Sequence, residues 1–214
     1  MKPEQIDEFF RRMAALNPSP VSDLEYSNPY TLLVAVVLSA QATDAGVNKA
    51  TRNLFPLADN PYDMVALGEA VVRDKIKTIG LFNGKAKNVI KLSEMLIDQH
   101  GGAVPQTRKA LEKLPGVGRK TANVVLNIAF EKPTIAVDTH IFRVGNRTRM
   151  AKGKTVDDVE RKLVRKVPAQ WKRHAHNWLI LHGRYTCKAR KPDCPNCQVI
   201  DLCPYPDKTP AAGG

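Results

Sequence analysis

Apolar residues recur along this chain at spacings of three and four, the period that gathers them on one face of an α-helix. The segment 85–99 shows the pattern clearly, with one face made of Ala86, Val89, Ile90, Ser93, Leu96 and Ile97. The apolar stretch 32–38 predicts a buried helix, because it is far shorter than the ~20 residues that span a bilayer. Strand patterns are nearly absent, and only 134–137 predicts a short extended piece. We therefore predict an all-α fold.

Helix start and stop signals accompany this periodicity. Asn28-Pro29 and Asn60-Pro61 each place an N-cap residue before a proline suited to the first helical position. Thr155-x-x-Asp158 predicts a capping box for a helix through residue 167, and Pro168 opens the helix that leads to the C-terminal cysteines. Gly101-Gly102 predicts the end of the helix that contains residues 85–99.

Composition and charge narrow the class of partner. The 214 residues are 43% hydrophobic, enough for a proper core in one large domain or two small ones. Lysine and arginine number 33 against 21 acidic residues, which gives a net charge of +12 and a pI near 9.7. This balance favours a polyanionic partner, nucleic acid first, although a basic surface can also serve solubility alone. The N-terminus MKPEQIDEFFRRM lacks the apolar segment of a signal peptide, so we expect a cytoplasmic protein, nucleoid-associated if bacterial, with no membrane partner.

A glycine-rich turn, LPGVGRK at residues 114–120, lies between two predicted helices. Thr107 is the expected N-cap of the first, and the second runs from Arg119 to about Phe130. Gly116 and Gly118 allow positive φ and close approach of a ligand, so backbone N–H groups can converge on an anion such as phosphate. An ordinary corner between two helices with a solvated lysine is the alternative.

Lys120 occupies the start of the second predicted helix. One face of this helix is largely apolar and comprises Thr121, Val124, Val125 and Ile128. Lys120, Asn123 and Asn127 share another face, so Lys120 should point away from the core and lie beside the turn. It is the candidate amine for chemistry.

All four cysteines lie near the C-terminus, at Cys187, Cys194, Cys197 and Cys203. Thiolates this close in sequence can converge on one metal centre, and on spacing alone both an iron–sulfur cluster and zinc remain open. Only Cys194 and Cys197 have the spacing of a zinc knuckle. The loop 188–193 carries three cations, including Lys191, and either contacts a phosphate backbone or merely covers the metal.

The segment LPGVGRKTANVVL, followed by VDTH at residues 137–140, resembles the helix-hairpin-helix and catalytic-aspartate region of the endonuclease III family of DNA repair glycosylases with lyase activity. The likeness extends from about residue 28 to 203. It implies two helical lobes with a DNA cleft between them: a central domain, 21–132, with the helix-hairpin-helix at about 107–130, and a second domain made of 1–20 plus 133–206. The tail 207–214 should be mobile.

The same resemblance assigns roles to residues. It implies catalytic roles for Lys120 and Asp138, facing each other across the cleft, and [4Fe-4S] ligation by the four cysteines. It implies DNA or base contacts for Gln41, Leu81, Glu112, Gly116, Gly118, Arg119 and Lys191. Without the family, Asp138 is an N-cap, Glu112 an exposed helix residue, and Gln41 and Leu81 ordinary polar and partly buried positions.

The chemistry follows from these roles. A neutral Lys120 amine can attack the sugar C1′, and we expect burial, the hairpin dipoles and Arg119 to favour that neutral form. The resulting Schiff base permits β-elimination, so an amine nucleophile predicts a lyase as well as a glycosylase. The target base must leave the duplex, and Gln41 and Leu81 would fill the gap.

We therefore predict a monomeric bifunctional DNA glycosylase and abasic-site lyase that acts on damaged double-stranded DNA, removes oxidised pyrimidines such as thymine glycol, and carries a [4Fe-4S] cluster. A monofunctional glycosylase of the same superfamily, such as the adenine-removing branch, is the first alternative. A non-enzymatic helix-hairpin-helix DNA-binding module is the second.

Overall fold

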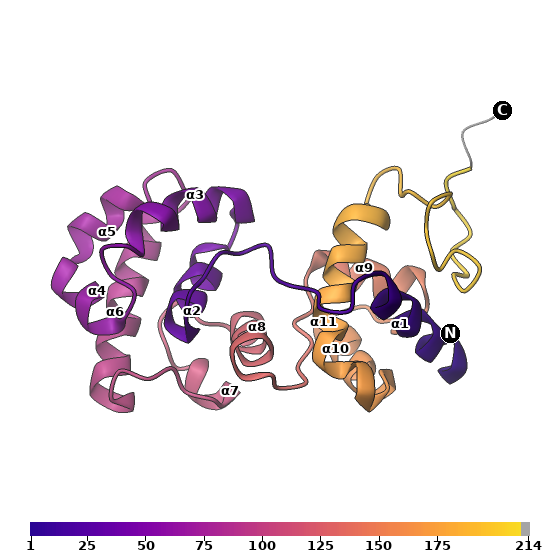
Figure 1. Ribbon diagram of the computed structural model, residues 1–214, viewed down its shortest axis with the longest axis horizontal. Helices are drawn as coiled ribbons and strands as arrows, with labels where there is room; N and C mark the ends of the chain where they lie inside the picture. The colour runs from indigo at the N-terminus through magenta and orange to yellow at the C-terminus, as the bar shows by residue number, and fades with distance from the viewer. Residues whose placement is uncertain (211–214) are drawn as a thin grey trace. The chain divides into compact units, whose positions relative to one another are not determined.

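The computed structural model describes residues 1–210 and is all-helical, with no β-strand in that range, which confirms the predicted fold class (Figure 1). The described chain forms two compact units, residues 22–132 and residues 1–21 plus 133–210. Within residues 1–210, no helix is both long and apolar enough to cross a membrane. Of the predicted mobile tail, residues 211–214 lie outside the described part of the chain.

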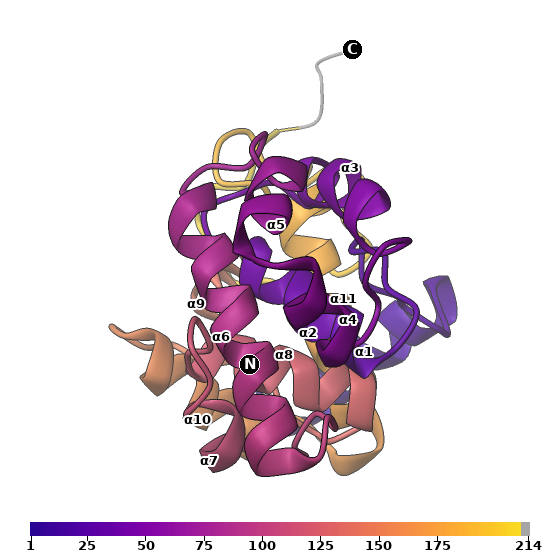
Figure 2. The ribbon, with the colours of Figure 1, turned by 90° about the vertical axis from the view of Figure 1, so that its left-hand side faces the viewer.

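The unit formed by residues 22–132 contains seven helices among its described residues. They are α2 (Pro29–Leu38), α3 (Asp44–Leu54), α4 (Pro61–Leu67), α5 (Glu69–Lys75), α6 (Phe82–His100), α7 (Arg108–Leu111) and α8 (Arg119–Phe130). The short helices α4 and α5 pack beside the long α6 (Figure 2). α2 is buried along almost its whole length and packs against α3, α6 and α8. The predicted buried helix at 32–38 is therefore confirmed.

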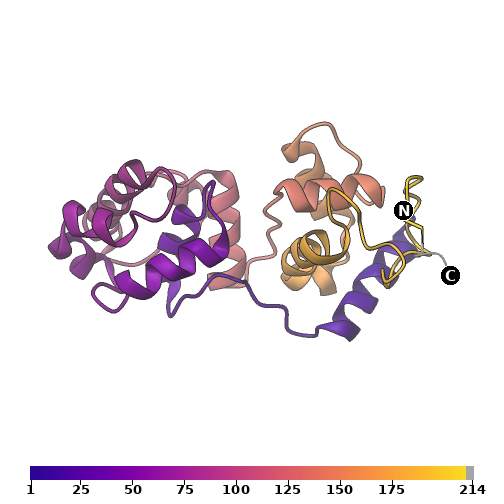
Figure 3. The same cartoon turned by 90° about the horizontal axis from the view of Figure 1, so that it is seen from above.

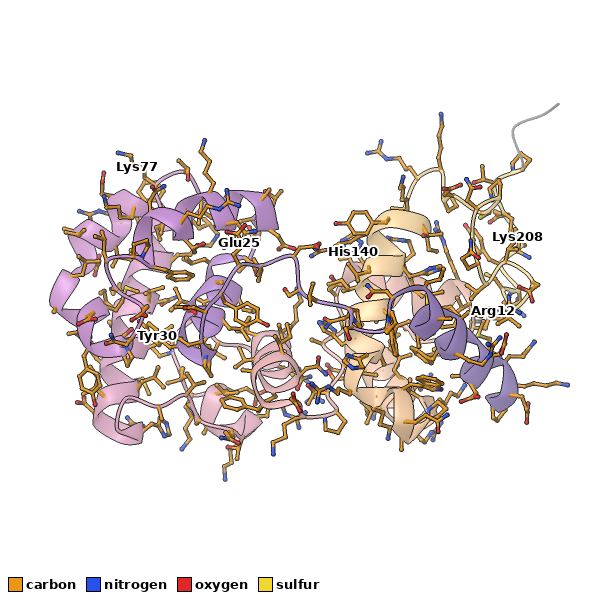
Figure 4. The ribbon with its side chains drawn as sticks, viewed as in Figure 1. Arg12, Glu25, Tyr30, Lys77, His140 and Lys208 are labelled. Atoms are coloured by element: carbon orange, nitrogen blue, oxygen red, sulfur yellow. The ribbon has the colours of Figure 1, made fainter. Side chains whose placement is uncertain are left out.

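The other unit joins the N-terminal helix to the C-terminal part of the chain. Its elements are α1 (Pro3–Leu16), α9 (Thr139–Arg147), α10 (Val156–Lys166), a 3₁₀ turn (Ala169–Trp171), α11 (Lys172–Leu181) and a π-helical turn (His182–Thr186). Phe9 and Phe10 of α1 are fully buried beside Trp178 and Leu179 of α11. Figure 3 shows α1 beside the C-terminal segment, and Arg12, labelled in Figure 4, forms hydrogen bonds with Asp201 there.

Most of the predicted caps are confirmed. Asn28 and Asn60 accept hydrogen bonds from backbone N–H groups two residues after their prolines, and Thr155 accepts one from the N–H of Asp158. The reciprocal hydrogen bond of the predicted capping box does not form among the described residues, because the Asp158 carboxylate accepts from Arg161 instead. The α10 helix ends at residue 166, and a 3₁₀ turn follows Pro168 before α11 begins. Gly101, with φ of +58°, ends α6 as expected.

One expectation about a helix face is wrong. Asn123 and Asn127 do not share an exposed face with Lys120, since they are 1% and 5% exposed while Lys120 is exposed. Asn127 is accommodated in the interior because its amide donates a hydrogen bond to the carbonyl oxygen of Lys132 at 3.2 Å. The predicted helix that contains residues 85–99 is confirmed as α6, which begins three residues before Lys85.

Candidate active site and cysteine cavity

The predicted glycine-rich turn joins α7 to α8. Thr107 caps α7 by accepting a hydrogen bond from the N–H of Ala110 at 3.3 Å. Gly116 has a φ of +78°, and a Cβ at this position would lie 3.0 Å from Asn88 Nδ2 and 3.2 Å from Val37 Cγ1. Glycine is thus required here by both backbone conformation and close packing.

Gly118 differs from the expectation that both glycines adopt positive φ. It is the N-cap of α8 with φ of −94° and ψ of 178°, an extended conformation open to any residue. No described atom lies within 4 Å of the position a Cβ would take. Nothing in the described residues therefore requires a glycine at 118, and the free space lies at a helix N-terminus without a side-chain cap, where an anion binds favourably.

Lys120 lies in the first turn of α8 and is exposed. In the described structure its amine forms no hydrogen bond or ion pair, so it is available to a ligand. The expectation that the protein buries this amine is wrong for the free molecule. Glu112, immediately after α7, is also exposed, and its nearest cation is the Arg108 guanidinium, 3.9 Å away.

Strained backbone marks three of the predicted DNA contacts. Among the described residues, five other than glycine have positive φ, and three of these are Gln41 (55°), Leu81 (60°) and Lys191 (48°). A left-handed conformation costs a non-glycine residue about 1–2 kcal/mol. All three side chains are exposed, Leu81 by 64%, so burial does not repay this cost. Such outliers concentrate at binding sites, where strain fixes the direction of a side chain.

Asp138 belongs to the other unit and is the N-cap of α9. Its Oδ1 accepts hydrogen bonds from the backbone N–H groups of His140 and Ile141 at 2.9 and 2.8 Å. Within the described residues, Oδ2 forms no hydrogen bond. The carboxylate is therefore fixed by one oxygen and offers the other, which reconciles the N-cap interpretation with a catalytic one.

The four cysteines surround one cavity near the C-terminus. All are free thiols, and each is partly buried. The cavity comprises about 400 Å³ of space not filled by atoms, part of it open to solvent, and its lining includes Val199, Ile200 and Arg147. Burial raises the pKa of the Cys197 thiol to about 11. Binding a metal centre would therefore displace protons from these thiols, because the ligand is the thiolate.

Two arginines of α9 connect this cavity to the rest of the unit, and sequence reasoning missed both. Arg143 donates to the carbonyl oxygens of Cys187 at 2.8 Å and Gly183 at 2.7 Å. Its Nη2 also lies 3.3 Å from Nδ1 of His140, a residue labelled in Figure 4. Arg147 Nη1 lies 3.5 Å from Cys187 Sγ, and its guanidinium stacks 4.6 Å from the centre of the Tyr205 ring.

Protein contacts already close the basic loop 188–193. The N–H groups of Lys188 and Asp193 both donate to the carbonyl oxygen of Thr186 at 2.9 Å. Arg147 donates to the carbonyl oxygens of Lys188 at 2.6 Å and Ala189 at 2.9 Å. The loop therefore holds the exposed Lys191 in a defined position.

Donor chemistry at the cavity fits a thiolate-bound cluster. Four partly buried thiols, apolar walls and a guanidinium near one sulfur are the features that hold and tune iron–sulfur centres. Across residues 1–210, no three His, Cys, Asp or Glu side chains have the spacing of a site for a single metal ion.

Comparison with known proteins gives concordant results. Residues 34–169 match the family model described as HhH-GPD superfamily base excision DNA repair protein. The chain is 59% identical to endonuclease III of Escherichia coli (strain K12), over 94% of this chain and 95% of that protein. It is 54% identical to endonuclease III of Rickettsia conorii, over 96% of this chain and 98% of the relative.

Solved structures agree. A trapped endonuclease III–DNA covalent intermediate, in an estranged-adenine complex, matches with a TM-score of 0.88 and 44% identity, covering 96% of this chain and 97% of that one. A thermostable thymine-DNA glycosylase matches with a TM-score of 0.83 and 27% identity, covering 94% and 96%. The chain therefore belongs to the HhH-GPD superfamily of base excision DNA repair proteins and, within it, to the endonuclease III family of DNA glycosylases with lyase activity.

Proposed function

We propose that this protein removes oxidised pyrimidines from duplex DNA through a Schiff base on Lys120 and then cleaves the strand 3′ to the site by β-elimination. The observation that carries the proposal is the exposed Lys120 amine, free of internal partners, in the first turn of a helix that follows a glycine hairpin. A covalent protein–DNA intermediate has been trapped for a 44% identical relative, which supports an amine nucleophile here.

Binding comes first in the proposed sequence. Gly116, Gly118 and Arg119 place backbone N–H groups and a cation where a DNA phosphate can approach the N-terminus of α8. Gln41 and Leu81, fixed by their left-handed backbone, would fill the space left by the extruded base, and Glu112 would contact that base. Lys191 would contact the phosphate backbone from its closed loop.

The lysine then carries out the covalent steps. The neutral Lys120 amine attacks C1′ of the damaged nucleotide, the N-glycosidic bond breaks, and the departing base takes a proton. Ring opening gives a protonated imine between Lys120 and C1′. A base removes a 2′ proton, the C3′–O bond breaks, and the 5′ phosphate of the downstream fragment leaves. Water hydrolyses the imine and regenerates the amine.

Asp138 supplies charge and proton transfer in this scheme. Its free Oδ2 would stabilise positive charge on the sugar as the base departs, or shuttle protons. Its Oδ1 is held by two backbone N–H groups, so the carboxylate has little freedom to rotate away. Because Lys120 is exposed in the free protein, bound DNA would have to exclude water from its amine and so favour the neutral form.

Cys187, Cys194, Cys197 and Cys203 would hold a [4Fe-4S] cluster. When bound, the cluster would cross-link the segment 187–203 and so stabilise the basic loop. Arg143 and Arg147 would join that segment to α9, the helix that Asp138 caps.

Borohydride trapping tests the proposal. Duplexes carrying thymine glycol or an abasic site are incubated with wild type, Lys120→Ala or Lys113→Ala, reduced, and resolved on a denaturing gel. Lys113 is exposed and precedes the hairpin, so it controls for loss of a nearby positive charge. A covalent band on both substrates that only Lys120→Ala abolishes is expected. No adduct with wild type, despite intact binding, would leave a water-using glycosylase or a binding module.

A further inference from the structure

An open pocket lies at the N-terminal end of α6. Its walls are residues 81–85 and Asn88, together with Val37 and Ala40 at the end of α2 and the hairpin residue Gly116. All of these residues belong to the unit 22–132. We call this the α6 pocket. It adjoins both the hairpin and the exposed Leu81.

Lys85 is one of the residues that line the α6 pocket, and its amine is buried. The residue is 5% exposed, and within the described residues its Nζ has no hydrogen-bond partner. An isolated buried ammonium is costly, because the lost hydration is not replaced. Burial accordingly lowers the pKa of Lys85. An unsatisfied buried polar group in a native protein calls for an explanation, and a bound anion is one that fits a cation.

The helix terminus adds positive potential to the same pocket. Leu81 is the N-cap of α6, and this residue gives the helix no side-chain cap. The first turn has no acidic residue, and none of the described residues that line the pocket is acidic. The partial positive charge of a 19-residue helix and a buried amine therefore meet in one concave site.

We propose that the α6 pocket binds one backbone phosphate of the DNA and that the Lys85 ammonium is its counter-ion. The inference rests on the proposed function, because it takes the ligand to be the duplex that Leu81 enters. A phosphate suits the pocket better than a base edge, since both positive features are satisfied by negative charge. Leu81, 64% exposed on the rim, would lead the strand to this position.

Salt dependence of DNA binding tests the proposal. Each neutralised phosphate contributes about −0.9 to the slope of log K against log [salt]. The affinity of Lys85→Met is measured from 50 to 300 mM NaCl on a duplex with a non-cleavable abasic analogue, beside wild type and Lys91→Met. Lys91 is exposed on the same helix and controls for net charge. Lys85→Met should bind roughly tenfold more weakly, with a slope shallower by about 0.9, while Lys91→Met matches wild type.

Stability separates this role from a structural one. Lys85→Met replaces a buried, unpartnered cation by an apolar chain of similar length, so its melting temperature should equal or exceed that of wild type. Asn83→Asp gives a second route, because it places a carboxylate in the first turn of α6 at the pocket. It should raise the melting temperature and weaken DNA binding, since the carboxylate competes with phosphate.

Several results would overturn the assignment. If Lys85→Met leaves the slope of log K against log [salt] unchanged, Lys85 does not neutralise a DNA phosphate. If the loss of affinity varies with the base opposite the lesion while the slope is unchanged, the Lys85 amine contacts a base edge and not a phosphate. Inorganic phosphate that raises the melting temperature of wild type but not of Lys85→Met, with no change in the DNA slope, would assign the pocket to a free phosphate compound.

Failure of the proposed function gives a different pattern. Borohydride trapping of Lys91→Met at saturating DNA should match wild type, because Lys120 and Lys85 are both intact. If wild type forms no adduct but the slopes still differ, the amine-nucleophile chemistry fails while the phosphate site stands.

Discussion

Replacement of Asp138 by asparagine and by alanine separates the two roles that its carboxylate combines. Oδ1 accepts hydrogen bonds from the N–H groups of His140 and Ile141 at 2.9 and 2.8 Å, while Oδ2 forms none in the described residues. Asparagine is as good an N-cap as aspartate, so Asp138→Asn should retain the cap and lose only the charge. Asp138→Ala loses both.

The expected stabilities follow from the helix terminus. Loss of the negative charge at the N-terminus of α9 should cost Asp138→Asn about 0.3–1 kcal/mol. Loss of the cap should cost Asp138→Ala about 1–2 kcal/mol, equivalent to a melting temperature lower by roughly 2–8 °C for a chain of this size. Thr155→Ala, which removes the cap of α10 in the same unit, is the matched control for destabilisation alone.

Activity should not follow stability in this series. Under single-turnover conditions on a thymine glycol duplex, Asp138→Asn and Asp138→Ala should both lose about 10²- to 10⁴-fold in the rate of base release. Thr155→Ala should keep its rate at a temperature well below unfolding. If Asp138→Asn retained the wild-type rate while Asp138→Ala lost it, the carboxylate would be only a cap, and the catalytic role would be refuted.

Three further outcomes are expected. Gly116→Ala should lose about 1–3 kcal/mol of folding free energy, because the new Cβ would meet Asn88 and Val37 at a residue with positive φ. Gly118→Ala should stay within about 0.5 kcal/mol of wild type and should weaken DNA binding instead. Equal losses of stability for the two variants in urea denaturation would contradict this expectation. Tyr30→Phe should cost about 1 kcal/mol by the same assay, because the Tyr30 hydroxyl lies 2.6 Å from Ser93 Oγ in the core (Tyr30 is labelled in Figure 4). Hydrogen bonds from two arginines of α1 lower the pKa of Glu8 to about 2. Any extra folding stability of wild type over Glu8→Gln should therefore be present above pH 4.5 and disappear as the pH falls toward 2. A stability difference that grew on acidification would refute the assignment.

Local signals in the sequence predicted what local interactions determine. Asn28 and Thr107 were identified as caps because an N-cap depends on its own side chain and the next three residues. The bounds of α8 were predictable because Gly118 directly precedes the helix and the helical spacing of apolar residues continues from there to Phe130. Asp138 was predictable as an N-cap on the same grounds.

Features that depend on tertiary packing were not predictable. Arg143 and Arg147 contact the cysteine segment from positions some 40 residues away in the chain, and no local pattern distinguishes them from surface arginines. Asn123 is buried although its side chain is polar, because the neighbouring helices cover that face of α8. The burial of Lys85 was missed because it depends on the packing of α6 against α2, which the local sequence does not reveal.

Local preferences are broken at positions that the proposed DNA interface would use. Gln41, Leu81 and Lys191 adopt left-handed conformations with exposed side chains, and Lys85 buries a cation without a described partner. Each should lower the stability of the free protein. Substitutions that remove such unfavourable conformations would stabilise most proteins. Their retention is therefore expected mainly where a ligand uses the geometry. The stability of Lys85→Met relative to its DNA affinity is therefore informative, because only a binding role predicts that the first rises or holds while the second falls.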